Sequence, residues 1–333
     1  MNKGTKTARW PVMVAKTIPI YGLQRGTVLI NDEPLVVSSR IEEFLHLRSV
    51  KAEFNTDHAE VMCTTSDFLQ YKIYLYACPK NDKSTYVEVM MMGGCGYGFQ
   101  RERKAIINAA RSLVVVKDTS NFSKQFKIPS SIKGLYVAPS TNDLENILCR
   151  AIDQIHSNDP STALFALQNL AFMTNSKKAH PETARKFSRL IMKSRSSVID
   201  MIVSIYISQT SNMSGKTSEQ ICDACLCILT NGINSLPKND RFLDQENEYF
   251  IESLIPSLLH DLERLECTHR ACLVLTCLSL LVKNSSLASA MIQRTNIRSF
   301  MEQAIEVGRE EHFLLEQTAI STINLFEQKM IVV

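Results

Sequence analysis

The sequence predicts an α+β domain, an antiparallel sheet with helices on one face, followed by an all-α solenoid of stacked helical repeats. Three observations support this fold class. Apolar and polar residues alternate in segments between residues 59 and 92, which is the period of half-buried strands. Between residues 159 and 328, a pattern of small and apolar residues recurs at helical spacing. The charge also changes sign between these two parts of the chain.

The N-terminal domain is expected to begin and end with a helix. Ser39 and Glu42 have the spacing of a capping box, and the apolar residues that follow fit one face of a helix. We expect antiparallel strands at about 59–63, 69–76 and 86–92, and a closing helix from about 100 to 116. That closing helix would pack through Ile106, Ala109, Ala110 and Leu113. Both helices would cover the same face of the sheet.

The C-terminal domain is predicted from a recurring helix. Its four copies start at Ala163, Ala224, Ala271 and Ala319. Successive copies are therefore 61, 47 and 48 residues apart, close to the period of roughly 40–47 residues of stacked two-helix and three-helix repeats. The longer first interval contains the polar segment 208–216, which we interpret as an inserted loop.

The copy that contains Ala166, Leu167, Asn169, Leu170 and Ala171 resembles armadillo-type repeats, so the array is similar to an armadillo or HEAT-like solenoid. Such arrays form a concave groove because each repeat rotates slightly on its neighbour. The resemblance implies a protein partner in that groove.

Residues 41–111 resemble the kinase-associated C-terminal domain, also called the kinase-associated-one fold. The resemblance lies in a first helix that runs into 50–54, in the strand 71–75, and in a glycine-containing passage from the last strand to an aromatic and basic helix at 96–101. Domains of this family bind anionic phospholipids or hold a kinase domain in check. No kinase catalytic-loop or metal-binding motif precedes the segment here, so we expect docking on a membrane or partner rather than autoinhibition in cis.

We predict four segments: a basic tail at 1–30, the kinase-associated-like module at 31–117, a linker at 118–141 and the helical repeats at 142–328. Residues 1–140 hold 19 Lys and Arg against 12 Asp and Glu, a net charge of +7. Residues 141–333 hold 18 against 22, a net charge of −4. The acid-free tail is compatible with a transit peptide, but Pro11 and Pro19 interrupt any amphipathic helix, which favours a solvated tail.

The candidate binding site is a basic stripe on the closing helix. Arg101, Lys104, Asn108 and Arg111 recur at intervals of three and four residues and so share one helical face, with Arg103 nearby. We assign Arg101, Arg103, Lys104 and Arg111 to anion or lipid binding, against the alternative of an ordinary solvated face. Nucleic acid is not the expected partner because aromatic residues are not interleaved with the basic ones.

Two other motifs do not indicate a phosphate-binding or metal-binding site. The glycine-rich segment 93–98 lacks the Lys and the Ser or Thr of a phosphate-binding P-loop. We therefore interpret it as a strand-to-helix turn that needs positive φ. Anion binding at the N-terminus of the next helix stays an open alternative. Cys222 and Cys225 have C-x-x-C spacing, but they lie in an apolar helix and are expected in the core. We therefore predict no metal and no cofactor.

We predict a non-enzymatic adaptor or scaffold, in which the basic module docks on anionic lipid or a partner and the array binds protein. The alternative is a regulatory subunit that binds a protein kinase or other enzyme directly. An enzyme is not expected, because none of the seven histidines lies in a nucleophile or metalloprotease motif, although catalytic triads also assemble from distant residues. The sequence has ten cysteines and no recognisable secretory signal, which indicates a cytoplasmic protein. It has no apolar run long enough to span a membrane, so we expect it to be peripheral at membranes where the module docks.

Overall fold

The structure is a computed structural model of the whole chain. It describes residues 9–65, 68–94, 96–113, 139–157, 159–176, 178–193, 198–211, 215–236, 248–265 and 267–331. The chain divides into two compact units, one formed mainly by its N-terminal part and the other by the helices that follow α2.

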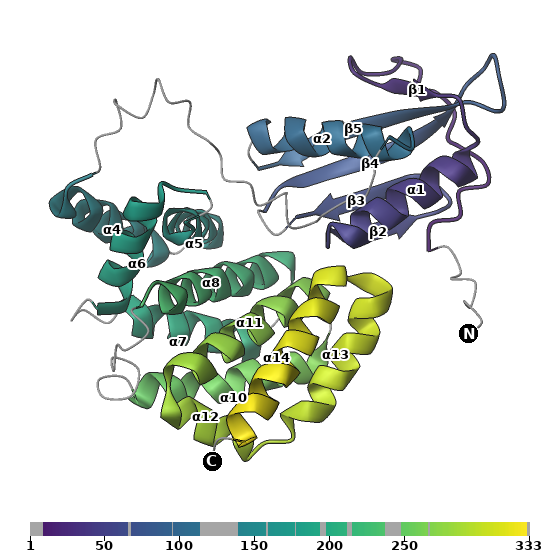
Figure 1. Cartoon of the computed structure of the whole chain (residues 1–333). Coiled ribbons are helices and arrows are strands. Elements are labelled where there is room, and N and C mark those ends of the chain that lie inside the picture. Colours follow the sequence, from purple (N-terminus) through teal and green to yellow (C-terminus); the bar gives the residue numbers. More distant parts are fainter. Residues whose placement is uncertain are drawn as a thin grey trace. The chain divides into compact units, whose positions relative to one another are not determined.

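The first unit contains a five-stranded antiparallel sheet (Figure 1). Its elements are β1 (Val28–Ile30), α1 (Pro34–Leu47), β2 (Lys51–Asn55), β3 (Glu60–Thr64), β4 (Gln70–Ala77), β5 (Thr85–Gly93) and α2 (Gly96–Ala110). The strand order is β1-β5-β4-β3-β2. The predicted α+β class is confirmed for this unit.

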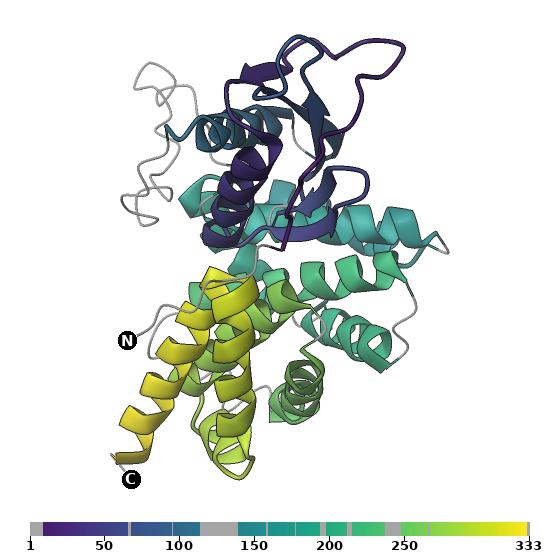
Figure 2. The ribbon, with the colours of Figure 1, turned by 90° about the vertical axis from the view of Figure 1, so that its right-hand side faces the viewer.

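Both helices cover the same face of the sheet, as expected, and lie side by side on it (Figures 1 and 2). In the central strand β4, Tyr71, Ile73 and Leu75 are fully buried, and Ile73 lies opposite Val61 of β3 and Val89 of β5. Because side chains of a strand alternate between faces, every second residue of β4 reaches the core under α1 and α2.

The predicted boundaries of the two helices are wrong. Helix α1 begins at Pro34, whose fixed φ suits a first helical position, so Ser39 lies inside the helix and forms no capping box. Both helices end in a Schellman motif, with Ser49 and Ser112 at φ of 54° and 59°. The closing helix therefore stops at Ala110, and Leu113 is 65% exposed instead of packed.

The predicted solvated tail at 1–30 is wrong for Trp10, Val12, Ala15 and Ile30, which are buried. Trp10 and Val12 are fully buried in the core of the first unit, and the Trp10 ring lies 5.8 Å from that of Phe54. Residues 28–30 form β1, an edge strand that pairs with β5 and was not expected from the sequence. Apolar side chains in this basic stretch decide its position, because their burial outweighs the preference of scattered Lys and Arg for water.

The polar face of the sheet is also partly covered. Tyr76 of β4 lies on the face opposite that of its neighbour Leu75, yet it is only 3% exposed. Its hydroxyl donates to Glu88 Oε2 at 3.0 Å, and the Gln24 backbone N–H donates to Glu88 Oε1 at 2.9 Å. A segment before β1 is thereby tied to the outer face of β5.

All regular elements described after α2 are helices. They are α4 (Thr141–Ile155), α5 (Pro160–Thr174), α6 (Pro181–Lys193), α7 (Val198–Ser211), α8 (Lys216–Ser235), α10 (Glu248–Arg264), α11 (Thr268–Asn284), α12 (Ser286–Gln293), α13 (Ile297–Glu311) and α14 (Phe313–Ile331). The first two start at side-chain caps, from Ser140 and Asp159.

The four recurring stretches fall in α5, α8, α11 and α14, and these helices pack against one another in sequence order. Helices α7, α10 and α12 form a second series of neighbouring helices. Figure 1 shows α8, α11 and α14 side by side. The recurrence in the sequence therefore corresponds to a recurrence in packing.

Of two other predicted segments, one is too long and the other lies mostly outside the described residues. The loop expected at 208–216 is too long, because α7 continues to Ser211 and α8 begins at Lys216. Most of the linker expected at 118–141 lies outside the described residues, and its last residue is already in α4. No helix among the described residues has the length and apolar character needed to cross a bilayer.

The two units should respond separately to a core mutation. Leu167 in α5 is fully buried, so Leu167→Ala should destabilise the helical unit by about 2–5 kcal/mol. Trp10, the only tryptophan, is buried in the sheet unit. In urea unfolding, the circular dichroism transition should move to lower urea while the Trp10 fluorescence transition stays in place.

The matched control is Phe165→Ala on the same helix, where the side chain is 59% exposed and the expected change is within about 0.5 kcal/mol. A joint shift of the fluorescence and dichroism transitions in Leu167→Ala would show that the two units unfold as one.

Candidate anion-binding face on α2

The turn between β5 and α2 sets where the basic helix begins. Gly94 has φ of 102°, and a Cβ at this position would lie 2.9 Å from the Leu69 Cα. Both facts require glycine, which confirms the predicted positive φ at this residue. Gly96 and Gly98 belong to the first turn of α2, so only part of the glycine-rich segment is a turn, and Cys95 lies outside the described residues.

Helix α2 has one buried and one exposed side. Ile106 and Ala110 are fully buried against the sheet unit, as predicted. Arg101 and Lys104 are exposed on the helix, and Arg111 is exposed at its end, where its backbone N–H still donates to the Ile107 carbonyl at 3.1 Å. The structure thus brings three of the four predicted basic residues to the solvent side of one helix.

The fourth predicted residue, Arg103, is engaged within the protein. Its Nη2 donates to the Gly26 carbonyl at 2.5 Å and its Nη1 to Gln100 Oε1 at 3.4 Å. Arg103 therefore ties α2 to the segment before β1, and the sequence pattern alone could not reveal this contact between distant residues.

A buried carboxylate anchors the same helix from beneath. Glu102, with 4% of its side chain exposed, forms an ion pair and a hydrogen bond with Arg48, which follows α1. Arg101 Nη2 lies 3.8 Å from the same Glu102 oxygen. Lys104 and Arg111 have no carboxylate partner among the described residues, so their charges are available to an external anion.

A second basic face, not expected from the sequence, lies on α6. Arg185, Lys186 and Arg189 are exposed, whereas Phe187 on the opposite side is fully buried. Lys186 pairs with Glu182 at 3.2 Å. The signal was present: residues 177–195 hold seven Lys or Arg and a single acid. Averaging the charge over the whole acidic half concealed it.

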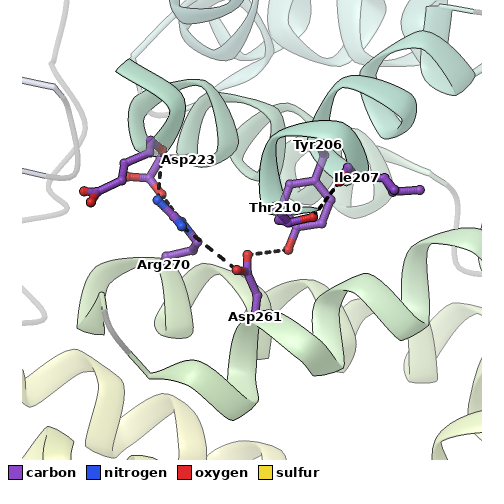
Figure 3. A network of polar contacts seen from close by, with 7 residues as sticks. Tyr206, Ile207, Thr210, Asp223, Asp261 and Arg270 are labelled. Carbon is purple, nitrogen blue, oxygen red and sulfur yellow. Dashed lines mark hydrogen bonds and ion pairs between the residues drawn. The ribbon is translucent and has the colours of Figure 1, made fainter. Parts of the chain in front are cut away.

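The helical unit also holds a buried network of titratable side chains from four helices (Figure 3). The Tyr206 hydroxyl of α7 donates to Asp261 Oδ2 of α10 at 2.6 Å. Arg270 of α11 donates through Nε to Asp223 Oδ1 of α8 at 2.9 Å, and its Nη1 lies 4.0 Å from Asp261 Oδ1. Arg270 Nη2 further donates to the Glu219 carbonyl at 3.1 Å.

The environment shifts the protonation equilibria of this network. Burial raises the pKa of Asp261, although Tyr206 and Arg270 act in the opposite direction. Burial and the nearby Asp261 carboxylate raise the pKa of Tyr206. For Arg270, burial opposes the charged form, but the attraction of Asp223, the hydrogen bond to it and the nearby Asp261 together outweigh burial and raise the pKa. The groups satisfy one another in the interior, which is the arrangement of a structural clamp between helices.

The cysteines of the helical unit lie mainly in its core. Cys222, Cys225, Cys272 and Cys277 are buried, and burial raises the pKa of Cys222 and of Cys277 to about 12. These thiols are protonated at neutral pH and act as small core residues. Within the described part of the chain, no three His, Cys, Asp or Glu side chains converge in a way that could hold a metal ion.

Comparison with known protein families, with curated proteins and with solved structures gave no match to this chain. Architecture and surface chemistry therefore define its class: an antiparallel sheet unit with an exposed basic helix, joined in one chain to a unit of packed helices.

The buried network predicts a pH-dependent stability effect. Arg270→Ala leaves Asp261 and Asp223 buried without their cation and should cost about 3–5 kcal/mol near pH 8. When folding raises the pKa of a carboxyl group, the free energy of unfolding of the protein falls as the pH rises through that pKa. Removal of Arg270 should raise the pKa of Asp261 further, because Arg270 acts to lower it. The cost should therefore shrink near pH 5, as measured by urea unfolding followed by circular dichroism.

The control is Arg150→Ala, an exposed arginine of α4, which removes the same charge and should change stability by less than about 0.5 kcal/mol at both pH values. An equal cost of Arg270→Ala at pH 5 and pH 8 would contradict the assigned role of Asp261.

Proposed function

We propose that the protein is a non-enzymatic adaptor whose sheet unit docks on an anionic membrane surface while its helical unit holds a protein partner. The observation that carries the proposal is the exposed set of Arg101 and Lys104 on α2 and Arg111 just after its end, while Ile106 and Ala110 of the same helix are buried in the core. Two of these cations lack a carboxylate partner among the described residues, so docking on an anion displaces no internal ion pair from them.

The size of the attraction supports an adaptor rather than a permanent membrane anchor. Each Lys or Arg near an anionic surface contributes roughly 1 kcal/mol. Three such residues therefore give about 3 kcal/mol, roughly a hundredfold enrichment at the membrane. Docking of this strength is reversible, and a second attachment through the helical unit would determine where the protein resides.

Support for a partner-binding helical unit comes from the ordered packing of α5, α8, α11 and α14. We interpret this series as an armadillo-like solenoid, whose successive repeats create an extended binding surface. The resemblance of residues 41–111 to kinase-associated domains supports membrane docking by the sheet unit, because that family includes phospholipid-binding members.

The test is vesicle binding by the full chain. The wild-type protein should sediment with vesicles that contain phosphatidylserine and remain in solution with neutral vesicles. Because the Debye length falls from about 10 Å at 0.1 M salt to about 3 Å at 1 M, the bound fraction should fall with added salt. The variant in which Arg101, Lys104 and Arg111 are all replaced by Glu should lose the binding.

The matched control reverses Arg185, Lys186 and Arg189 on α6, which changes the net charge of the protein by the same amount. This variant should bind vesicles nearly as well as the wild type, and unfolding curves should show that both variants are folded. Equal losses in the two variants would indicate that net charge, not the α2 face, drives binding. A wild-type protein that ignores acidic vesicles at low salt would favour the alternative, a regulatory subunit that docks directly on an enzyme.

A further inference from the structure

An apolar pocket opens in the helical unit between α12, α13, α14 and the end of α11. Its volume is about 210 Å³. Six apolar side chains line it: Val282, Ile292, Ile297, Met301, Ile323 and Phe326. The polar network of Figure 3 lies elsewhere, since none of its residues lines the pocket.

The pocket has a buried floor and a partly exposed wall. Val282, Ile292 and Met301 are each 2% exposed, so the floor belongs to the hydrophobic core. Ile323 and Phe326 on α14 are only half-buried, although both line the pocket. An apolar group that entered would therefore remove additional apolar surface of α14 from water, which is the source of hydrophobic affinity.

The volume decides which class of group fits. An engineered cavity of about 150 Å³ holds a benzene molecule, whereas sites for drug-sized ligands and cofactors measure about 300–1,000 Å³. The present pocket lies between these limits. It accommodates one phenyl ring or one branched aliphatic side chain, and it is too small for a cofactor.

The charges around the opening restrict the occupant further. Arg298 is already held between two carboxylates, with Glu302 at 3.1 Å and Glu327 at 3.4 Å. Lys329 also lines the pocket, is exposed and has no carboxylate partner among the described residues. Among the described residues that line the opening, Lys329 is thus the cation without a carboxylate partner, which favours an occupant that carries a carboxylate close to its apolar group.

We infer that this pocket receives a partner protein through one bulky apolar side chain that has an acidic residue beside it, with the carboxylate paired to Lys329. The inference rests on the proposed adaptor function and specifies the chemistry of the partner of the helical unit. A single buried anchor in a pocket is the usual energetic centre of such an interface, and the surrounding contacts add specificity.

The test uses the full chain with ¹³C-labelled isoleucine methyl groups, assigned by single Ile→Val variants. The probe is the capped tetrapeptide serine-phenylalanine-aspartate-serine at millimolar concentration. The methyl signals of Ile292, Ile297 and Ile323 should shift and saturate, whereas that of Ile106 in the sheet unit should stay unchanged.

Two control peptides separate the two parts of the inference. With alanine in place of phenylalanine, the shifts should disappear. With asparagine in place of aspartate, the affinity should fall, by up to about fivefold for an exposed ion pair. The variant Lys329→Gln should bind the aspartate and asparagine peptides equally, and Ile323→Glu should abolish the shifts.

Several results would overturn the inference: no shift with the phenylalanine peptide, equal shifts with the alanine peptide, or equal affinity of the wild type for the aspartate and asparagine peptides. Each of these three results is measured with the wild-type protein and so does not depend on the folding of a variant. Vesicle binding without peptide binding would reject the pocket and leave the proposed membrane docking intact, and the reverse outcome would reject the docking alone.

Discussion

The packing of α5, α8, α11 and α14 in series is the constraint on which the helical unit depends, and each of these helices contains a buried alanine. Ala166, Ala224 and Ala319 are completely buried, and Ala271 is 2% exposed. A side chain larger than alanine at such positions would push the helices apart, because protein interiors are packed as densely as organic crystals and have little free volume. Three of them, Ala224, Ala271 and Ala319, also mark the recurrence in the sequence, whose first copy is counted from Ala163.

Close approach also brings polar groups of neighbouring helices within bonding distance. Asn231 Nδ2 of α8 donates to Thr174 Oγ1 of α5 at 3.2 Å, and the hydroxyls of Ser279 on α11 and Thr322 on α14 lie 2.8 Å apart. The buried network around Arg270 continues this pattern with charged groups. Such contacts fix which helix faces meet, because a shifted packing would leave buried polar groups without partners.

The parts of the fold that the sequence predicted were those with local, periodic signals. Alternation along residues 69–76 identified the central strand, and the recurrence of small residues identified the helices that pack in series. Contacts between distant residues were not predictable. Nothing near Arg103 indicates that its guanidinium bonds to the Gly26 carbonyl, and nothing near Arg270 indicates Asp223, which precedes it by 47 residues. The burial of Trp10 was missed because the charge of residues 1–30, with five Lys or Arg and no Asp or Glu, was weighed above their apolar side chains.

The candidate site was predicted to a similar extent. Periodicity correctly placed Arg101 and Lys104 on the exposed side of α2, since helical spacing determines which residues share a face. Periodicity could not locate the end of the helix, which depends on the left-handed conformation of Ser112. The basic face of α6 was missed because its charge was averaged with that of acidic helices farther along the chain.

The central claim is that α2 is the surface that meets an anionic membrane, and lysine footprinting tests it most directly. The full chain would be acetylated briefly with and without phosphatidylserine vesicles, and labelling of each lysine would be read by mass spectrometry. Lys104 on α2 and Lys186 on α6 are both exposed in the free protein. The account predicts that vesicles protect Lys104 and leave Lys186 labelled at its solution rate. Vesicle-bound protein in which Lys104 is labelled as fast as in solution would contradict it.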